Sequence, residues 1–407
     1  MTQDTPRSHR ILREISGGNA VVSVLAIGLA LLVGSVLIVL TDPEVQAASG
    51  YLFARPADAV LAAGDAIGGA CSALFQGAVF NGTRVGWANQ IKPLTETLTL
   101  ATPLIAAGLG VSVAFRSGLF NIGGRGQMLV AAAAAGWISW SFPMPYPLHM
   151  LVCVLGAVAC GALWGGVAGV LKARTGAHEV IVTIMLNYVA FYLVSFLLRT
   201  PGALQAPGSN GPKSPAALDT AVMPTLSDLL GIGSFRLHAG FVLVVAATSL
   251  VWWVLNRSGL GFRFRAVGEN PDAARVAGIE VRRVYLVAMM MSGGLAGLAG
   301  ASQVLGTTTT GFGSGIDAGI GFDAITVALL GRSRPWGVFA GGLLFGALKT
   351  GGYAMQAAQT VPIDLILVVQ AVIVLLIAAP PLVRAVFRLP APAAGARLPR
   401  TPKAVTR

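Results

Sequence analysis

Long apolar runs separated by shorter polar connections make up most of this sequence of 407 residues. A helix needs about 20 apolar residues to cross a hydrocarbon layer of about 30 Å. The runs are continuous and lack the alternation of barrel strands, so the pattern indicates helices. It predicts ten spans, at residues 20–40, 93–115, 126–140, 148–171, 178–198, 239–255, 284–305, 319–330, 336–352 and 363–379.

The third and eighth of these segments, 126–140 and 319–330, are too short for a straight perpendicular crossing. We expect them to be tilted, broken or re-entrant. A bilayer tolerates such backbone only where protein or a water-filled cavity covers it.

Composition agrees with this pattern. Apolar residues make up 55% of the chain, charged residues only 11%, and mean hydropathy is +0.75. Soluble domains carry about 25% charged residues. The predicted fold is therefore an all-α polytopic transmembrane bundle at residues 20–380, with an N-terminal tail at 1–19 and a basic tail at 381–407, which we expect to be disordered.

Basic residues set the expected orientation, because cytoplasmic connections carry the excess of Lys and Arg. With the N-terminus inside, 21 of the 28 basic residues fall in inner segments. The outer connections 41–92 and 199–238 are poor in positive charge for their length. Both termini are thus predicted to be cytoplasmic, and an anionic inner leaflet accounts for the net charge of +12 without any nucleic acid.

The first apolar run also precedes a small-x-Ala pattern at residues 45–47. Cleaved signal sequences have a shorter apolar region of about 7–15 residues, so we interpret the run as a membrane anchor, with cleavage as the alternative.

Several glycines recur at four-residue spacing, a pattern that lets membrane helices approach closely. They are Gly161, Gly165 and Gly169; Gly293 and Gly297; Gly337 and Gly341; and Gly342 and Gly346. The three cysteines and four histidines lack metal-ligand spacing, so no metal site or cofactor is predicted.

Catalytic motifs are absent from the sequence. It contains no G-x-x-x-x-G-K-[ST] motif, and the glycine-rich run GFGSGIDAGIG at 311–321 has no following Lys. This run is interpreted as a flexible turn or a broken helix beside a cavity. No set of catalytic side chains falls within a span, so the chain is not predicted to be an enzyme.

Polar side chains inside predicted spans are costly in hydrocarbon and face either a solute pathway or another helix. Glu179, Thr183 and Asn187 recur every four residues and so share one helix face. Such a stripe suits a neutral, hydrogen-bonding solute, but the same residues could instead hold helices together. The candidate pathway residues are Asn121, Gln127, Glu179, Thr183, Asn187, Tyr188, Gln303 and Asp323.

The one long charged connection, residues 256–283, is the best candidate for contact with a partner. Gly268 is expected to break the preceding helix, Asn270 to cap a new helix, Pro271 to begin it and Asp272 to favour its positive end. Ala273, Ala274, Val276 and Ala277 would give that helix a small apolar face. A soluble partner's groove suits such a face better than a membrane surface, where bulkier residues are usual.

Ion coupling is weakly supported, because Glu179, Asp323 and Asp364 all fall near predicted span ends. A carrier with neither an ion site nor a P-loop must take its energy from a separate protein. An ion-coupled carrier, a channel and a cell-envelope assembly factor remain alternatives.

Four segments in order, GLFNIGGRGQMLVAA at 118–132, HEVIVTIMLNYVA at 178–190, RAVGENPDAARVAGIEVRR at 265–283 and SGGLAGLAGA at 292–301, resemble the membrane subunits of bacterial ABC importers of the simple-sugar and nucleoside branch. The resemblance is closest to nucleoside permeases and covers residues from about 93 to 380. Arg125 departs from it, because relatives commonly have an acidic or small residue there.

The resemblance implies an inner-membrane permease that imports a nucleoside or, alternatively, a simple sugar such as ribose. It implies cytoplasmic ABC ATPase subunits, a second permease subunit and an extracytoplasmic solute-binding protein as partners, besides membrane lipids. By position it assigns the ATPase-coupling helix to Gly268, Glu269, Asn270, Pro271, Asp272, Ala273 and Ala274.

Overall fold

The computed structural model describes residues 19–232, 235–359, 361–362 and 364–388. Within these residues the secondary structure is helical apart from one isolated bridge between Thr225 and His238. The chain divides into two compact units, residues 1–59 with 364–407, and residues 60–363. Most of the two predicted tails, 1–18 and 389–407, lies outside the described residues.

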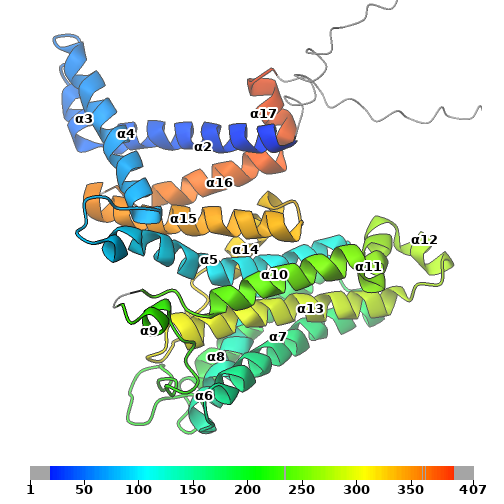
Figure 1. The fold of residues 1–407 in the computed structure, drawn as a ribbon. Coiled ribbons are helices and arrows are strands. Elements are labelled where there is room, and N and C mark those ends of the chain that lie inside the picture. The colour runs from blue at the N-terminus through cyan, green and yellow to red at the C-terminus, as the bar shows by residue number, and fades with distance from the viewer. Residues whose placement is uncertain (1–18, 233–234, 360, 363, 389–407) are drawn as a thin grey trace, which may run out of the picture. The chain divides into compact units, whose positions relative to one another are not determined.

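The first unit is built on helices α2 (Asn19–Thr41) and α16 (Asp364–Ala378), which correspond to the predicted first and last spans. They are antiparallel (Figure 1), and a Cβ at Gly34 would lie 2.5 Å from the side chain of Val369. The short helix α3 (Pro43–Ser49) follows α2, and α17 (Pro380–Val386) follows α16 and packs against α2. The start of α2 therefore lies at the same end of this unit as α17.

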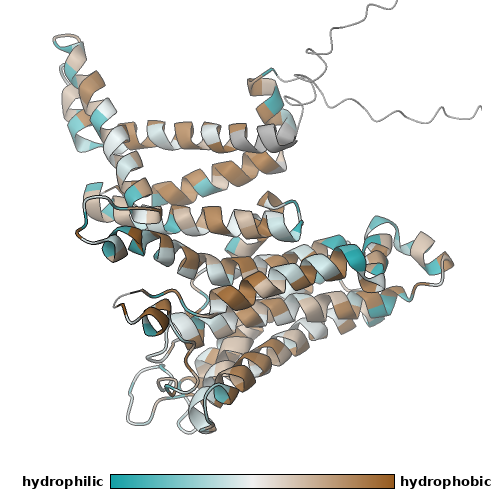
Figure 2. Cartoon of the chain, viewed as in Figure 1, coloured by the Kyte–Doolittle hydropathy of each residue, from teal (hydrophilic) through white to brown (hydrophobic). Residues whose placement is uncertain are grey.

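The second unit contains the remaining helices. They are α4 (Pro56–Ala78, which begins in the first unit), α5 (Trp87–Arg116), α6 (Gly124–Ser141), α7 (Leu148–Thr175), α8 (Glu179–Leu197), α9 (Leu226–Leu230), α10 (Gly240–Arg257), α11 (Gly259–Glu269), α12 (Pro271–Val276), α13 (Val281–Ser302), the π-helical turn η1 (Gln303–Thr307), α14 (Ile320–Leu330) and α15 (Pro335–Gln359). Apolar residues cover much of these helices, whereas polar residues are frequent around α11 and α12 (Figure 2).

The predicted glycine ridges are confirmed where α7 packs on α13. A Cβ at Gly161 or Gly165 would collide with the carbonyl oxygens of Gly293 and Met289, and one at Gly297 would lie 2.5 Å from the carbonyl oxygen of Ala157. Bare glycine backbones thus let the two helices meet directly, as small residues do in membrane bundles.

Helix α5 forms the centre of this unit. In its most apolar stretch, 83% of the residues are buried, which is the largest share among the candidate spans in the described residues. It runs antiparallel to α15, since Gly346 faces Ala101 while Gly342 faces Ile105. The end of α5 at Arg116 therefore lies beside the beginning of α15, where the Arg116 Nε donates a 3.0 Å hydrogen bond to the carbonyl of Ser333.

All ten predicted spans correspond to helices, but the count of ten is not confirmed as membrane crossings. Six described helices are long and apolar enough to cross a membrane, and a bent pair formed by α2 and α3 raises the number to seven. The short segments predicted at 126–140 and 319–330 are the short helices α6 and α14, and neither is among the helices that are long and apolar enough to cross a membrane.

The interpretation of residues 41–92 as a connection between two spans missed a helix. It contains α4, a helix of 23 residues that is itself one of the six candidates. Its composition of alanine and glycine with two aspartates lowers its hydropathy to 1.3, below that of the other five. This lower hydropathy explains why the apolar pattern did not separate it from the flanking loops.

Candidate functional site

Two helices of the second unit begin in its interior, and their starts meet. Helix α6 begins at Gly124 after a non-helical segment, 117–123, and α14 begins at Ile320 after the glycine-rich segment 311–319. A Cβ at Gly124 would lie 3.2 Å from the carbonyl oxygen of Gly321, and Gly321 itself contacts the backbone of Arg125. Side chains larger than hydrogen are excluded at this junction, as close backbone approach requires.

The junction lies well inside the bundle. Helix α14 has 11 residues, a rise of about 16 Å, and Ser292, which contacts the junction, lies eleven residues beyond the start of α13. This depth is about half of a hydrocarbon layer of about 30 Å. Starts of interrupted helices near the midplane are the usual surroundings of solute sites in transporters, because the positive ends of helices and freed backbone groups meet there.

A buried hydrogen-bond network holds the segment 117–123 in place. The Asn121 side-chain nitrogen donates to the Ser292 hydroxyl at 2.7 Å and to the side-chain oxygen Oε1 of Gln127 at 3.1 Å. The Asn121 oxygen accepts from the backbone N–H of Gly123 at 2.8 Å. All three side chains, Asn121, Gln127 and Ser292, are at most 2% exposed, so the network ties α13 to the start of α6.

The predicted polar stripe of α8 faces the same segment. The Asn187 side chain accepts from the Gly126 N–H at 2.8 Å and donates to the Ile122 carbonyl at 2.9 Å. The Thr183 hydroxyl accepts from the Ile122 N–H at 3.3 Å. Backbone that has left the helix at membrane depth must find partners, and α8 supplies them.

These contacts help to decide whether the predicted polar residues line a solute pathway or hold helices together. The polar atoms of Asn121, Gln127, Thr183 and Asn187 bond to protein, which favours helix association for those four residues. Glu179 forms an ion pair with Lys172 at 2.8 Å, and Gln303 is 7% exposed within η1. Tyr188, by contrast, is 56% exposed.

Two ion pairs flank the start of α14. Arg125 lies 3.2 Å from Asp317, which is buried, and its guanidinium lies 5.1 Å from the centre of the Phe191 ring. Asp323 on α14 pairs with Lys349 on α15 at 2.5 Å. The side chains of Arg125, Asp323 and Lys349 are 31%, 27% and 17% exposed, so these charges are partly open.

Asp323 was predicted as a pathway residue, whereas Arg125, Asp317 and Lys349 were not. Lys349 could have been selected from the sequence, because an ionisable residue inside an apolar run usually has a function and an oppositely charged partner. No sequence signal pairs Arg125 with Asp317, which is 192 positions away. The glycine-rich segment that was expected to border a cavity is thus fastened to α6 by its own acidic residue.

The predicted coupling helix is present as α12. The Asn270 side chain accepts from the backbone N–H groups of Asp272 and Ala273, both at 3.0 Å, and Pro271 occupies the first turn. Asp272 forms an exposed ion pair with Arg275 at 3.0 Å. The short helix projects beyond the end of α11 in Figure 1.

Two details of this prediction were wrong. Gly268 does not break a helix, since α11 continues through it to Glu269 and the break falls at Asn270. Ala274 is 3% exposed and anchors α12, so the outward face of α12 consists of Asp272, Ala273, Arg275 and Val276, the last 92% exposed.

Gly268 has a different role. A Cβ at Gly268 would lie 2.5 Å from the carbonyl oxygen of Arg116 and 3.1 Å from the backbone nitrogen of Gly118, whose φ of +72° favours glycine. The last turn of α11 therefore rests on the chain that leads directly to Asn121. The helix α13, which carries Ser292, follows α12 after four residues.

Two sets of contacts connect α12 to the Asn121 network, one through Gly268 and Gly118 and the other through α13. Both sets of contacts are closely packed, and a packed protein interior is compressed little.

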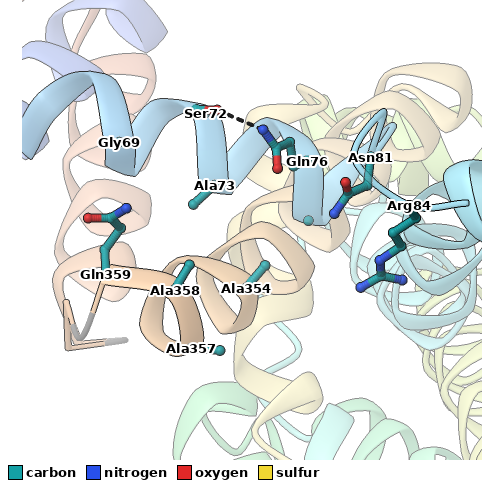
Figure 3. Close-up of a pocket in the computed structure, with 11 residues that line it drawn as sticks. Gly69, Ser72, Ala73, Gln76, Asn81, Arg84, Ala354, Ala357, Ala358 and Gln359 are labelled. Carbon is teal, nitrogen blue, oxygen red and sulfur yellow. Dashed lines mark hydrogen bonds between the residues drawn. The ribbon is translucent and has the colours of Figure 1, made fainter. Parts of the chain in front are cut away.

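The far end of the α5 and α15 pair carries a polar pocket of about 430 Å³ between α4 and α15 (Figure 3). Its polar lining comes from Ser72, Gln76, Asn81, Arg84 and Gln359. Gln76 donates a 2.9 Å hydrogen bond to Ser72, drawn as a dashed line in Figure 3. The described lining has no carboxylate, so the pocket suits neutral or anionic polar groups.

Comparison with known proteins identifies the family. Residues 94–378 match the family model described as branched-chain amino acid transport system, permease component. The chain belongs to this permease family. It is a multi-pass inner-membrane permease subunit of an ABC transporter and not an enzyme; ATP hydrolysis takes place in a partner subunit.

Named relatives in the family are similar over most of their length. The guanosine ABC transporter permease protein NupP of Bacillus subtilis is 39% identical over 70% of this chain and 80% of its own. The glucose ABC transporter permease protein TsgB13 of Haloferax volcanii is 37% identical over 69% and 75%, and the nucleoside ABC transporter permease protein NupB of Lactococcus lactis is 33% identical over 70% and 79%. No solved structure matches the chain.

Proposed function

We propose that this permease imports a nucleoside, and that α12 is the element through which a cytoplasmic ATPase drives it. The observation that carries the coupling proposal is the packing of Gly268 on Arg116 and Gly118, because it joins α12 to the buried network around Asn121. The names of two relatives, at 39% and 33% identity, support a nucleoside as solute.

The orientation follows from this coupling. The α12 end would face the cytoplasm and the pocket of Figure 3 would face outward, in agreement with the excess of basic residues in the predicted inner segments. The outer pocket would then be the place where an extracytoplasmic binding protein presents the solute. A second permease subunit would complete the pathway, as expected for an ABC importer.

Within the pathway, the partly exposed groups around the start of α14 are better placed to meet a solute than the fully bonded network. They are Arg125, Asp323 and Lys349, and the exposed ring of Tyr188 on α8 is a further candidate. Arg125 and Lys349 already have acidic partners, so the site is close to neutral and suits an uncharged solute. Exposed Tyr188 offers a ring on which a planar base could stack.

A simple sugar is the second candidate, because a relative named as a glucose permease is 37% identical. Uptake of radiolabelled guanosine, adenosine, ribose and glucose into cells that express the whole transporter distinguishes the two. Nucleoside uptake that requires this chain supports the proposal, and sugar uptake alone contradicts it.

Coupling is tested in the same cells by deleting residues 270–274. The variant should reach the membrane in normal amount, lose uptake and fail to retain the ATPase subunits during purification. Unchanged uptake would exclude α12 as the coupling element, whatever the solute.

A further inference from the structure

Three arginines from distant parts of the sequence converge at the α12 end of the second unit. Arg116 ends α5, Arg265 lies on α11, and Arg334 precedes α15. Together with Trp252 and Trp336 they line a cavity of about 460 Å³. Neither the transport network nor the proposed coupling helix uses this cavity.

The charge of this cavity is uncompensated. Its described lining contains no Asp or Glu, and within the described residues none of the three arginines forms an ion pair. Arg334 and Arg265 both lie close enough to Arg116 to repel its charge. Three cations held together without a counter-charge favour an anionic ligand.

Two of the guanidinium groups are held by the fold. Arg116 Nε donates to the carbonyl of Ser333 at 3.0 Å, and Arg265 Nη1 donates to the carbonyl of Leu255 at the end of α10. Each keeps other N–H groups for a ligand, because a guanidinium has five. Arg334 is exposed at the cavity. The forked arrangement of N–H donors in a guanidinium group matches the oxygens of a phosphate group.

The surroundings favour a lipid as the source of the phosphate. Trp252 and Trp336 are 39% and 46% exposed, and tryptophan is typical of the headgroup level of a membrane. From Trp336 a row of aromatic rings continues through Phe339, at 5.6 Å, to Phe241 on α10, a further 6.1 Å away. Only 28% of the α10 span is buried within this chain, so this row borders a helix whose surface the chain itself leaves largely uncovered.

We propose that the Arg116, Arg265 and Arg334 cavity binds the phosphate of an anionic phospholipid headgroup, with an acyl chain along the aromatic row between α10 and α15. Basic pockets between membrane helices at the cytoplasmic surface bind such headgroups. The site would link the α5 end, on which Gly268 rests, to the composition of the surrounding leaflet. It is independent of which solute is carried.

Native mass spectrometry of the purified full-length chain tests this proposal, with tetraoleoyl cardiolipin, dioleoyl phosphatidylglycerol and dioleoyl phosphatidylcholine as probes. Both anionic lipids should bind more tightly than phosphatidylcholine. Arg334→Gln should weaken their binding about fivefold, since one basic residue contributes about 1 kcal/mol near a membrane surface. Arg334 is chosen for substitution because, within the described residues, its side chain makes no hydrogen bond that the fold would lose.

Arg257→Gln is the matched control, because Arg257 is exposed at the same end of α10 and does not line the cavity. Its lipid binding should be unchanged, and Arg334→Lys should retain most of the affinity. Equal binding of phosphatidylcholine, or equal loss in both glutamine variants, overturns the proposal.

Two further outcomes would also overturn it. Displacement of the bound lipid by inorganic phosphate alone would make the cavity a site for free anions. Loss of ATPase subunits from Arg334→Gln, with lipid affinity intact, would make it a protein-docking surface.

Discussion

The amide of Asn121 donates a 2.7 Å hydrogen bond to the hydroxyl of Ser292, 171 positions later in the chain. This bond connects the start of α6 to α13 at a depth where backbone outside a helix has no water to satisfy it. The integrity of the interior junction therefore depends on a few buried side-chain contacts.

Removing this bond should destabilise the bundle. Ser292→Ala is expected to lower the free energy of unfolding by about 1 kcal/mol, because the Asn121 amide loses a buried partner. Thermal unfolding of the purified chain, followed by tryptophan fluorescence, measures the change. Ser139→Ala is the control, since the buried Ser139 hydroxyl bonds only to the carbonyl of Gly136 in its own helix. An equal loss of stability there would argue against a special role for Ser292.

A methyl group at Gly268 should disturb coupling. In Gly268→Ala the new Cβ meets the Arg116 carbonyl at 2.5 Å, so α11 must shift away from α5. We expect at least a tenfold loss of solute uptake by the complete transporter, with normal membrane insertion. Gly259→Ala, on the same helix with nothing within 4 Å of its Cβ, should transport normally.

The cap of α12 should be required for a stable complex. Asn270→Ala removes two 3.0 Å bonds to the start of α12 and is expected to cost about 1 kcal/mol of helix stability, whereas Asn270→Asp keeps an acceptor in place. Co-purification of the ATPase subunits should fall for the alanine variant only. Equal retention by both would show that the cap does not matter for docking.

The Asp323–Lys349 pair should tolerate exchange better than neutralisation. Asp323→Asn leaves Lys349 unpaired inside the bundle, so uptake and protein yield should both decrease. The double variant with Lys at 323 and Asp at 349 should recover part of both. A double variant no better than the single one would indicate that the positions, and not their pairing, are required.

Stability should depend on pH through His238, which lies just before α10 and is 2% exposed. Burial, together with the nearby charge of Arg236, lowers the pKa of His238 from 6.5 to about 4. Above pH 6.5 the His238 ring is neutral in both the folded and the unfolded chain, so it does not change the free energy of unfolding. Between about 6.5 and 4 the unfolded chain takes up a proton that the folded chain does not, so stability falls with pH.

The free energy of unfolding should decrease by about 2–3 kcal/mol over this pH range, because one pKa unit corresponds to about 1.4 kcal/mol. Melting temperatures of the wild type and of His238→Gln, measured from pH 7.5 to 4.5, give the contribution of the residue. A slope that is identical in the two proteins would assign the pH dependence to other groups.

Much of the fold follows from the apolar pattern, because a run of about 20 apolar residues leaves few alternatives to a membrane helix. The same holds for the glycine ridge of α7 and α13, whose spacing by four implies one close-packed face. The Asn270 cap followed from a motif that acts over three residues. These features are local, and local sequence specifies them.

The interior junction depends on longer distances. The sequence selected Asn121 and Asn187 but could not show that Asn187 bonds to Ile122 or that Asn121 bonds to Ser292, since that requires α8 and α13 to be placed. The pairing of Arg125 with Asp317 and the convergence of Arg116, Arg265 and Arg334 arise in the same way, from packing between segments far apart in the chain.

Because the backbones of α7 and α13 touch at Gly161, Gly165 and Gly293, neither helix can rotate or slide against the other without collision. The pair should behave as one rigid block during a transport cycle. We expect opening and closing to be accommodated outside this block, with backbone rotation at the segments without helical backbone, 117–123 and 311–319, once the side-chain bonds that hold them are exchanged.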